Sequence, residues 1–149
     1  MTLIFDQASS DLGRALVEYA ADSIIFADRE GLIRLWNPGS EALFGYAADE
    51  VIGQSLDLII PEKLRRAHWD GYRRALAAGH TLHGRRALPT RSMHKNGARL
   101  YVELSFSVVK DAQGVVIGAM SIGRDITARY LKEQSQKAPP EERAGLSRR

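Results

Sequence analysis

Residues 100–108 alternate between apolar and polar side chains, and this pattern restricts the fold more than any other in the chain. Every second residue from Leu100 to Val108 is apolar. Because successive side chains of a strand point to opposite faces, the alternation predicts a strand with one buried face. A sheet with one apolar face needs a covering layer, so the same chain must supply helices to cover it.

The segment Pro61–Gly79 predicts the covering helix. Proline stands at its first turn and glycine directly after its last, as is common at the two ends of a helix. One face repeats at helical spacing, with the opposite side basic. This face consists of Leu64, His68, Tyr72, Ala75 and Leu76. An imidazole in the middle of an inward face is either a ligand or a packed core side chain, and the spacing leaves both open.

Four further segments have the composition of strands, at 23–28, 32–36, 80–93 and 115–123. The first two form a hairpin, and Pro89 indicates an edge position or a bulge in the third. Short helices are predicted at 39–45 and 47–53, with an amphipathic helix at 12–20 and an exit helix from residue 124. We therefore expect an α+β fold, in which a five-stranded antiparallel sheet carries helices on one face and flanking helices at both termini.

Composition excludes several classes of function. The chain has 149 residues, no cysteine and a formal charge of +3. Disulfides, thiolate metal sites and cysteine nucleophiles are therefore excluded. We expect no nucleic-acid partner, no membrane association and a cytoplasmic location. The sequence has neither a glycine-rich phosphate loop nor a G-x-S-x-G turn, so we expect a protein that is not an enzyme.

Several short motifs, in this order and spacing, resemble the PAS family over about residues 20 to 130. They are Asp22–Asp28, Gly31–Asn37, Ala42–Tyr46, Glu50–Gly53, Pro61–Glu62, His94–Gly97, Val115–Gly118 and Gly123–Thr127. The resemblance implies a sensor or dimerisation module with the sheet derived above. It divides the chain into an N-terminal arm and flanking helix at 1–20, a sensory domain at 21–131 and a disordered polar tail at 132–149.

The resemblance also implies a ligand pocket between the 61–78 helix and the sheet. The candidate lining residues are His68, Tyr72, Leu88, Val102, Leu104, Phe106, Met120 and Ile122. One subgroup of the family binds b-type haem through a histidine on this helix, and His68 resembles that iron ligand. Haem b is therefore one candidate, another small ligand is the second, and a purely structural His68 is the third. Covalent flavin is excluded, because that chemistry needs a cysteine.

The expected function is small-molecule sensing, with the signal passing through the terminal helices to a partner or output domain that the sequence does not identify. The alternative is a ligand-free module for homodimerisation or protein interaction. The apolar stripe of the 11–20 helix must lie either on the domain or on a second copy of the chain, and we expect a homodimer through that helix.

Overall fold

A five-stranded antiparallel sheet, in the order β2-β1-β5-β4-β3, forms the centre of the structure. The computed structural model describes residues 7–137. The strands are β1 (Ser23–Asp28), β2 (Ile33–Trp36), β3 (Leu88–Met93), β4 (Arg99–Lys110) and β5 (Val116–Asp125). The helices are α1 (Gln7–Tyr19), α2 (Pro38–Phe44), α3 (Ala48–Val51), the 3-10 helix η1 (Leu56–Ile59), α4 (Glu62–Ala78) and α5 (Thr127–Lys137). The predicted α+β class and sheet are confirmed.

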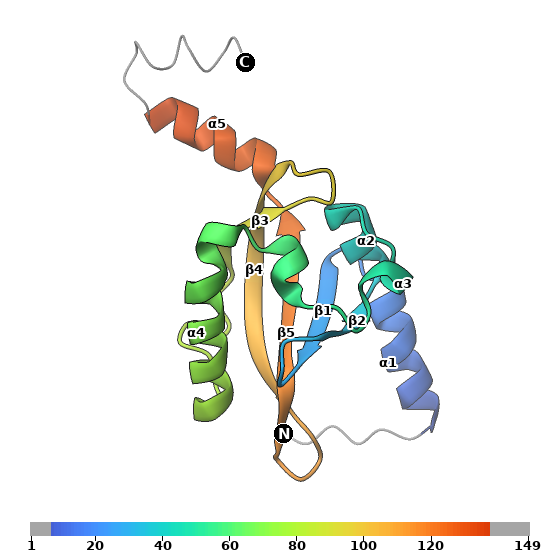
Figure 1. The fold of residues 1–149 in the computed structure, drawn as a ribbon. Coiled ribbons are helices and arrows are strands. Elements are labelled where there is room, and N and C mark those ends of the chain that lie inside the picture. Colours follow the sequence, from blue (N-terminus) through green and yellow to red (C-terminus); the bar gives the residue numbers. More distant parts are fainter. Residues whose placement is uncertain (1–6, 138–149) are drawn as a thin grey trace.

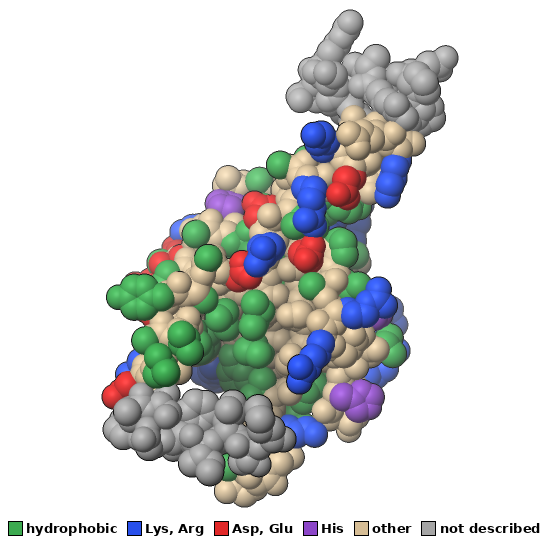
Figure 2. Space-filling view, turned by 180° about the vertical axis from the view of Figure 1, so that it is seen from behind, with side chains coloured by type: hydrophobic (Ala, Val, Ile, Leu, Met, Phe, Trp, Pro, Cys, Tyr) green, Lys and Arg blue, Asp and Glu red, His purple; other side chains and the backbone are tan. Residues whose placement is uncertain are grey.

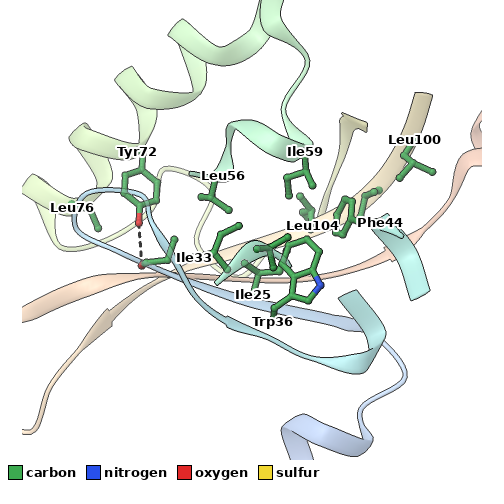
Figure 3. Packing of buried hydrophobic residues seen from close by; sticks show 13 residues of the cluster. Ile25, Ile33, Trp36, Phe44, Leu56, Ile59, Tyr72, Leu76, Leu100 and Leu104 are labelled. Atoms are coloured by element: carbon green, nitrogen blue, oxygen red, sulfur yellow. Dashed lines mark hydrogen bonds between the residues drawn. The ribbon is translucent and has the colours of Figure 1, made fainter. Parts of the chain in front are cut away.

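The helices between β2 and β3 cover one face of the sheet, whereas α1 and α5 lie outside this layer (Figure 1). Beneath them lies one apolar core, to which α4 contributes Tyr72 and Leu76 (Figure 3). The alternating face of β4 supplies Leu100, Val102 and Leu104, as its period predicted. The core therefore joins the covering helices to the middle of the sheet.

The strand predicted at 80–93 is shorter than expected. The ladder with β4 begins at Leu88, and residues 80–87 form an exposed loop of turns. Within this loop Gly84 has a φ of +59°, a left-handed conformation that favours glycine. The position of Pro89 is confirmed as an edge, because β3 pairs only with β4. The loop and the edge strand together form one border of the site described below.

Both terminal helices differ from the sequence prediction. Helix α1 starts at Gln7, ahead of the predicted range 12–20, and α5 continues to Lys137, so residues 132–137 of the predicted disordered tail are helical. A tertiary contact supports α5, because the Tyr130 ring stacks on Tyr101 of β4 with centroids 4.0 Å apart. The arm at 1–5 and the tail at 138–149 lie outside the described residues. Within residues 7–137, no helix has the length and apolarity needed to cross a bilayer.

Asn37 connects α1, the β1 strand and α2 through one buried amide. Its Oδ1 accepts hydrogen bonds from the backbone N–H of Ile24 at 2.8 Å and of Ser40 at 3.0 Å. Its Nδ2 donates to the carbonyls of Val17 and Asp22, both at 3.0 Å. Only 3% of Asn37 is exposed, so no water replaces these bonds if the side chain is removed. The Asn37 side chain therefore has a structural role at the turn between β2 and α2.

We predict that Asn37→Ala lowers the free energy of unfolding by about 2–4 kcal/mol, because buried donors and acceptors lose their partners. Urea denaturation followed by circular dichroism measures the change. Gln113→Ala, at an exposed turn, serves as the control and should change stability by less than about 0.5 kcal/mol. A similarly small change for Asn37→Ala would contradict the role assigned to this amide.

Candidate functional site

A cavity of about 300 Å³ lies between α4, the 80–87 loop and the strands β3, β4 and β5. A second cavity of about 110 Å³ lies beside it, under η1 and the start of α4. The two are neighbours, because they share His68, Tyr72, Thr90, Leu104, Phe106 and Ala119 as lining residues. The larger volume is at the lower end of the range of roughly 300–1,000 Å³ that is typical of small-molecule pockets.

Small side chains on α4 leave this space open. Ala67, Gly71 and Ala75 recur at intervals of four residues and all line the larger cavity. A Cβ atom built on Gly71 meets no heavy atom within 4 Å. Tyr72 and Leu76, which keep the helix on the sheet, lie in the core beside this stripe. Large side chains therefore anchor α4 on the sheet, and small side chains leave the cavity beneath it open.

His68 lines both cavities, as the helical spacing predicted. Its ring lies edge-on to Trp69, with centroids 4.6 Å apart, and 5.9 Å from the ring of Tyr72. Its Nδ1 is buried and has no hydrogen-bond partner among residues 7–137. Burial lowers the pKa of His68, and the opposing charge of Asp57 only partly offsets this effect. The imidazole is therefore neutral at pH 7.

Tyr72 ties α4 to the first strand. Its hydroxyl lies 3.1 Å from the carbonyl oxygen of Ala27 and 2.5 Å from that of Asp28, so its single proton is shared between them (Figure 3 draws one of these bonds). Burial, with a smaller contribution from the Asp28 carboxylate, raises the pKa of Tyr72 to about 12. The hydroxyl is consequently a fixed structural donor and stays protonated at neutral pH.

Trp69 faces away from the cavities and fixes the other side of α4. Its Nε1 donates to Oδ1 of Asp57 at 2.8 Å, and its ring covers the turn between β1 and β2 at Gly31. A Cβ atom at Gly31 would lie 2.2 Å from that ring. Gly31 also has a φ of +79°, so this turn needs glycine for two independent reasons. Trp69 thus positions the helix that carries His68.

The other predicted site residues divide into two groups. Leu88, Leu104 and Phe106 line the larger cavity, and Met120 borders the smaller one. Val102 is fully buried in the core and borders neither cavity, and Ile122 also borders neither. Placing Val102 and Ile122 in the pocket was therefore wrong.

The error at Ile122 comes from the parity of β5. The register pairs Ile25 with Ser121 and Ala27 with Ala119. Since Ile25 and Ala27 are buried core residues, Ala119 and Ser121 share the covered face, and Ile122 lies on the opposite face. Residues 115–123 are apolar on both parities, so the sequence had no signal to choose between them.

Sequence reasoning also missed lining residues on β3, β5, α4 and the loop after α4. Thr90 lies two residues after Leu88 on the same face of β3, and Ala119 lies on the face of β5 opposite to Ile122. Gly71 and the 81–86 loop border the cavity as well. A glycine inside a strong helical pattern was the one available signal, because it costs about 1 kcal/mol of helix propensity relative to alanine and so suggests a reason of packing or function.

We predict that the pKa of His68 lies below the ordinary histidine value of 6.5, and that folding stability therefore depends on pH through this residue. The unfolded chain binds this proton more tightly than the folded chain, so stability falls as the pH drops from above 6.5 through the folded pKa. Urea unfolding of wild type and His68→Gln at about pH 7.5 and 5.5 measures the difference. An equal pH dependence in both proteins would contradict the burial effect.

Comparison with known proteins places this geometry in a family. A family model for the PAS fold matches residues 17–131. The oxygen sensor protein DosP of Escherichia coli is 26% identical over 133 residues, which cover 89% of this chain and 16% of DosP. The sensor protein FixL of Bradyrhizobium diazoefficiens is 36% identical over 59 residues, which cover 40% of this chain and 12% of FixL. The chain thus spans only a small part of these relatives.

Solved structures agree with the sequence comparison. A PAS domain from Colwellia psychrerythraea superposes with a TM-score of 0.70 at 26% identity, covering 80% of this chain and 98% of that domain. An RNA-binding light-oxygen-voltage receptor superposes with a TM-score of 0.64 at 25% identity, covering 87% of this chain and 37% of the receptor. With a matched family model over most of its length and the same fold in solved relatives, this chain belongs to the PAS family.

Proposed function

We propose that this sensory PAS domain binds a small molecule in the cavity between α4 and the sheet. The observation that carries the proposal is the cavity of about 300 Å³ under His68, joined by a second one of about 110 Å³. Protein interiors are close-packed, and few of their voids exceed the size of a water molecule. Two neighbouring voids of this size, both lined by one unpartnered imidazole, favour ligand binding over packing alone.

Haem b is the larger of the candidate ligands. Similarity to an oxygen sensor and the inward position of His68 favour it. However, a metal-ligating histidine normally donates its second ring N–H to a carbonyl or carboxylate, and Nδ1 of His68 has no such partner. Tyr72, Leu104 and Phe106 also limit the volume in front of this ring. These residues do not fit a haem, and we propose a smaller organic ligand.

The signal would pass through the two central strands to the terminal helices. Tyr72 connects the cavity to β1, and β5 leads directly into α5. Arg124, at the end of β5, pairs with Asp22 ahead of β1 at 2.9 Å. A ligand that favours one arrangement of these strands would shift the populations of the terminal helices. The partner that reads this shift, or an output domain elsewhere in the protein, is not identified.

We further propose that the site acts by binding, without catalysis. The Tyr72 hydroxyl, whose pKa is raised to about 12, is held by backbone carbonyls and is a poor base at neutral pH. His68 lacks the hydrogen-bonded partner that orients the base in a nucleophile–base pair. The cytoplasmic location and the absence of nucleic-acid or membrane partners remain predictions from the sequence.

A homodimer through α1 is a second, compatible proposal. Leu12, Leu16 and Tyr19 follow one another on one side of α1 and are 59%, 63% and 87% exposed. They do not cover the sheet, so a second copy of the chain is the occupant we propose. Figure 2 shows hydrophobic side chains gathered on this reverse side of the molecule. The uncovered face of the central strands, with Ile122, would extend the same contact.

We predict that native mass spectrometry of the purified chain shows a bound organic molecule much lighter than haem, and that Gly71→Leu removes it by filling the cavity. Gly13→Leu is the matched control, because a Cβ atom at Gly13 also meets nothing within 4 Å but lies on α1, away from the cavity. Both variants should fold, since leucine favours a helix more than glycine does. A haem mass with a Soret band that His68→Ala abolishes would contradict the proposal of a smaller ligand.

For the dimer, we predict that Leu16→Glu converts the chain from twice to once the monomer mass in light scattering, because it places a charge in the apolar contact. Arg14→Glu, on the opposite side of the helix by its 200° offset from Leu12, is the control and should leave the mass unchanged. An unchanged mass for Leu16→Glu would count against α1 as the interface.

A further inference from the structure

The charges around the two cavities have one sign. The titratable side chains among the lining residues are His68, Tyr72, His83, Arg86 and Arg91. None of the described lining residues is aspartate or glutamate. A ligand that enters this space therefore meets donors and cations, and no carboxylate that would repel an anion or attract an amine.

Arg86 is the cation at the mouth of the larger cavity. It lies in the exposed 80–87 loop, which borders that cavity. Its side chain makes no hydrogen bond or ion pair with any residue in the described part of the chain, whereas Arg34, Arg124 and Arg129 each hold a carboxylate. Guanidinium is always charged and matches a carboxylate with two parallel N–H donors. The mouth thus presents an unpaired group suited to an acid.

The inner part of the larger cavity is suited to the neutral, apolar part of a ligand. Leu88, Leu104, Phe106 and Ala119 form its walls. The one hydroxyl on the helix side, that of Tyr72, already donates to backbone carbonyls. A full charge placed in such surroundings would lack compensation. The charged end of a ligand must therefore lie at the mouth, and its apolar end must point toward His68.

The volume of the larger cavity limits the size of the ligand. An engineered apolar cavity of about 150 Å³ holds benzene, which has six non-hydrogen atoms. On that scale a cavity of about 300 Å³ holds a ligand of roughly ten non-hydrogen atoms. An eight-carbon acid has this size.

We propose that the cavity under α4 binds an amphipathic carboxylate of roughly ten non-hydrogen atoms, with its apolar part between α4 and the sheet and its carboxylate at Arg86. This inference rests on the proposed function and adds the chemical class of the ligand. It assigns Arg86 as the residue that selects an acid over an alcohol or amine of the same length.

The test titrates the full chain with n-octanoate, 1-octanol and n-octylamine at neutral pH, followed by amide NMR spectra. Octanoate should bind about three- to tenfold more tightly than octanol, and octylamine should bind most weakly. The shifted amides should include those of Thr90 and Leu104, which lie at the cavity. Arg86→Gln should reduce the affinity for octanoate to that for octanol. Arg85→Gln is the matched control, since Arg85 is exposed in the same loop but borders neither cavity.

Other results would overturn the inference. Equal affinity for octanoate and octanol, with both weakened by Gly71→Leu, would mean that the cavity binds ligands without selecting an acid. Octanoate binding that Gly71→Leu leaves unchanged would place it elsewhere on the chain. Absence of binding by all three probes at millimolar concentration would exclude this ligand class, while the native mass measurement decides separately whether the domain binds a small molecule.

Discussion

The bond between the Tyr72 hydroxyl and the backbone of β1 is the contact on which the site depends. It joins the middle of α4 to the carbonyls of Ala27 and Asp28 in β1, which lies between β2 and β5 in the sheet. Because a phenol is long and rigid, it holds the helix away from the strands at a fixed height. The alanines and the glycine on the neighbouring stripe of α4 do not fill the space beneath, so this single contact both attaches the helix and leaves the cavity.

The sheet also contributes to the open volume of this cavity. The covered side of β5 carries Ala119, Ser121 and Gly123, none of which has a long side chain. At Gly123 there is no room for more, since a Cβ atom would lie 2.3 Å from Cδ2 of Leu104. At Ala119 the neighbouring space is open and belongs to both cavities. Close packing and open volume thus alternate along one strand, and side-chain size decides where each occurs.

Periodic patterns were enough to predict most of the fold from the sequence. The alternation of β4, the ends of α4 and the edge position of Pro89 are local signals, and they hold in the structure. The site was only partly predictable, because its lining depends on register. Leu88, Leu104 and Phe106 could be placed, but the side of β5 on which Ile122 lies is set by pairing with β1.

Other differences come from contacts between residues far apart in the chain. The first turn of α5 is held on β4 by the stack of Tyr130 on Tyr101, which no local pattern indicates. The partner of Arg124 is Asp22, 102 residues earlier, although Asp125 is its neighbour. In both places the fold brings together groups that are far apart in the sequence, and the local sequence pattern does not indicate such contacts.

The pairing of β1 with β5 has a mechanical consequence. Ser23 opens β1 opposite Gly123 near the end of β5, so the chain enters and leaves the sheet at neighbouring points. Helix α5 has 11 residues and is therefore about 16 Å long. A turn of about 5° at its base would move its far end by about 1.4 Å, given that length. Helices α1 and α5 therefore adjoin the sheet at neighbouring points and act as levers. A small change in the twist between β1 and β5 becomes a larger displacement at the far ends of these helices.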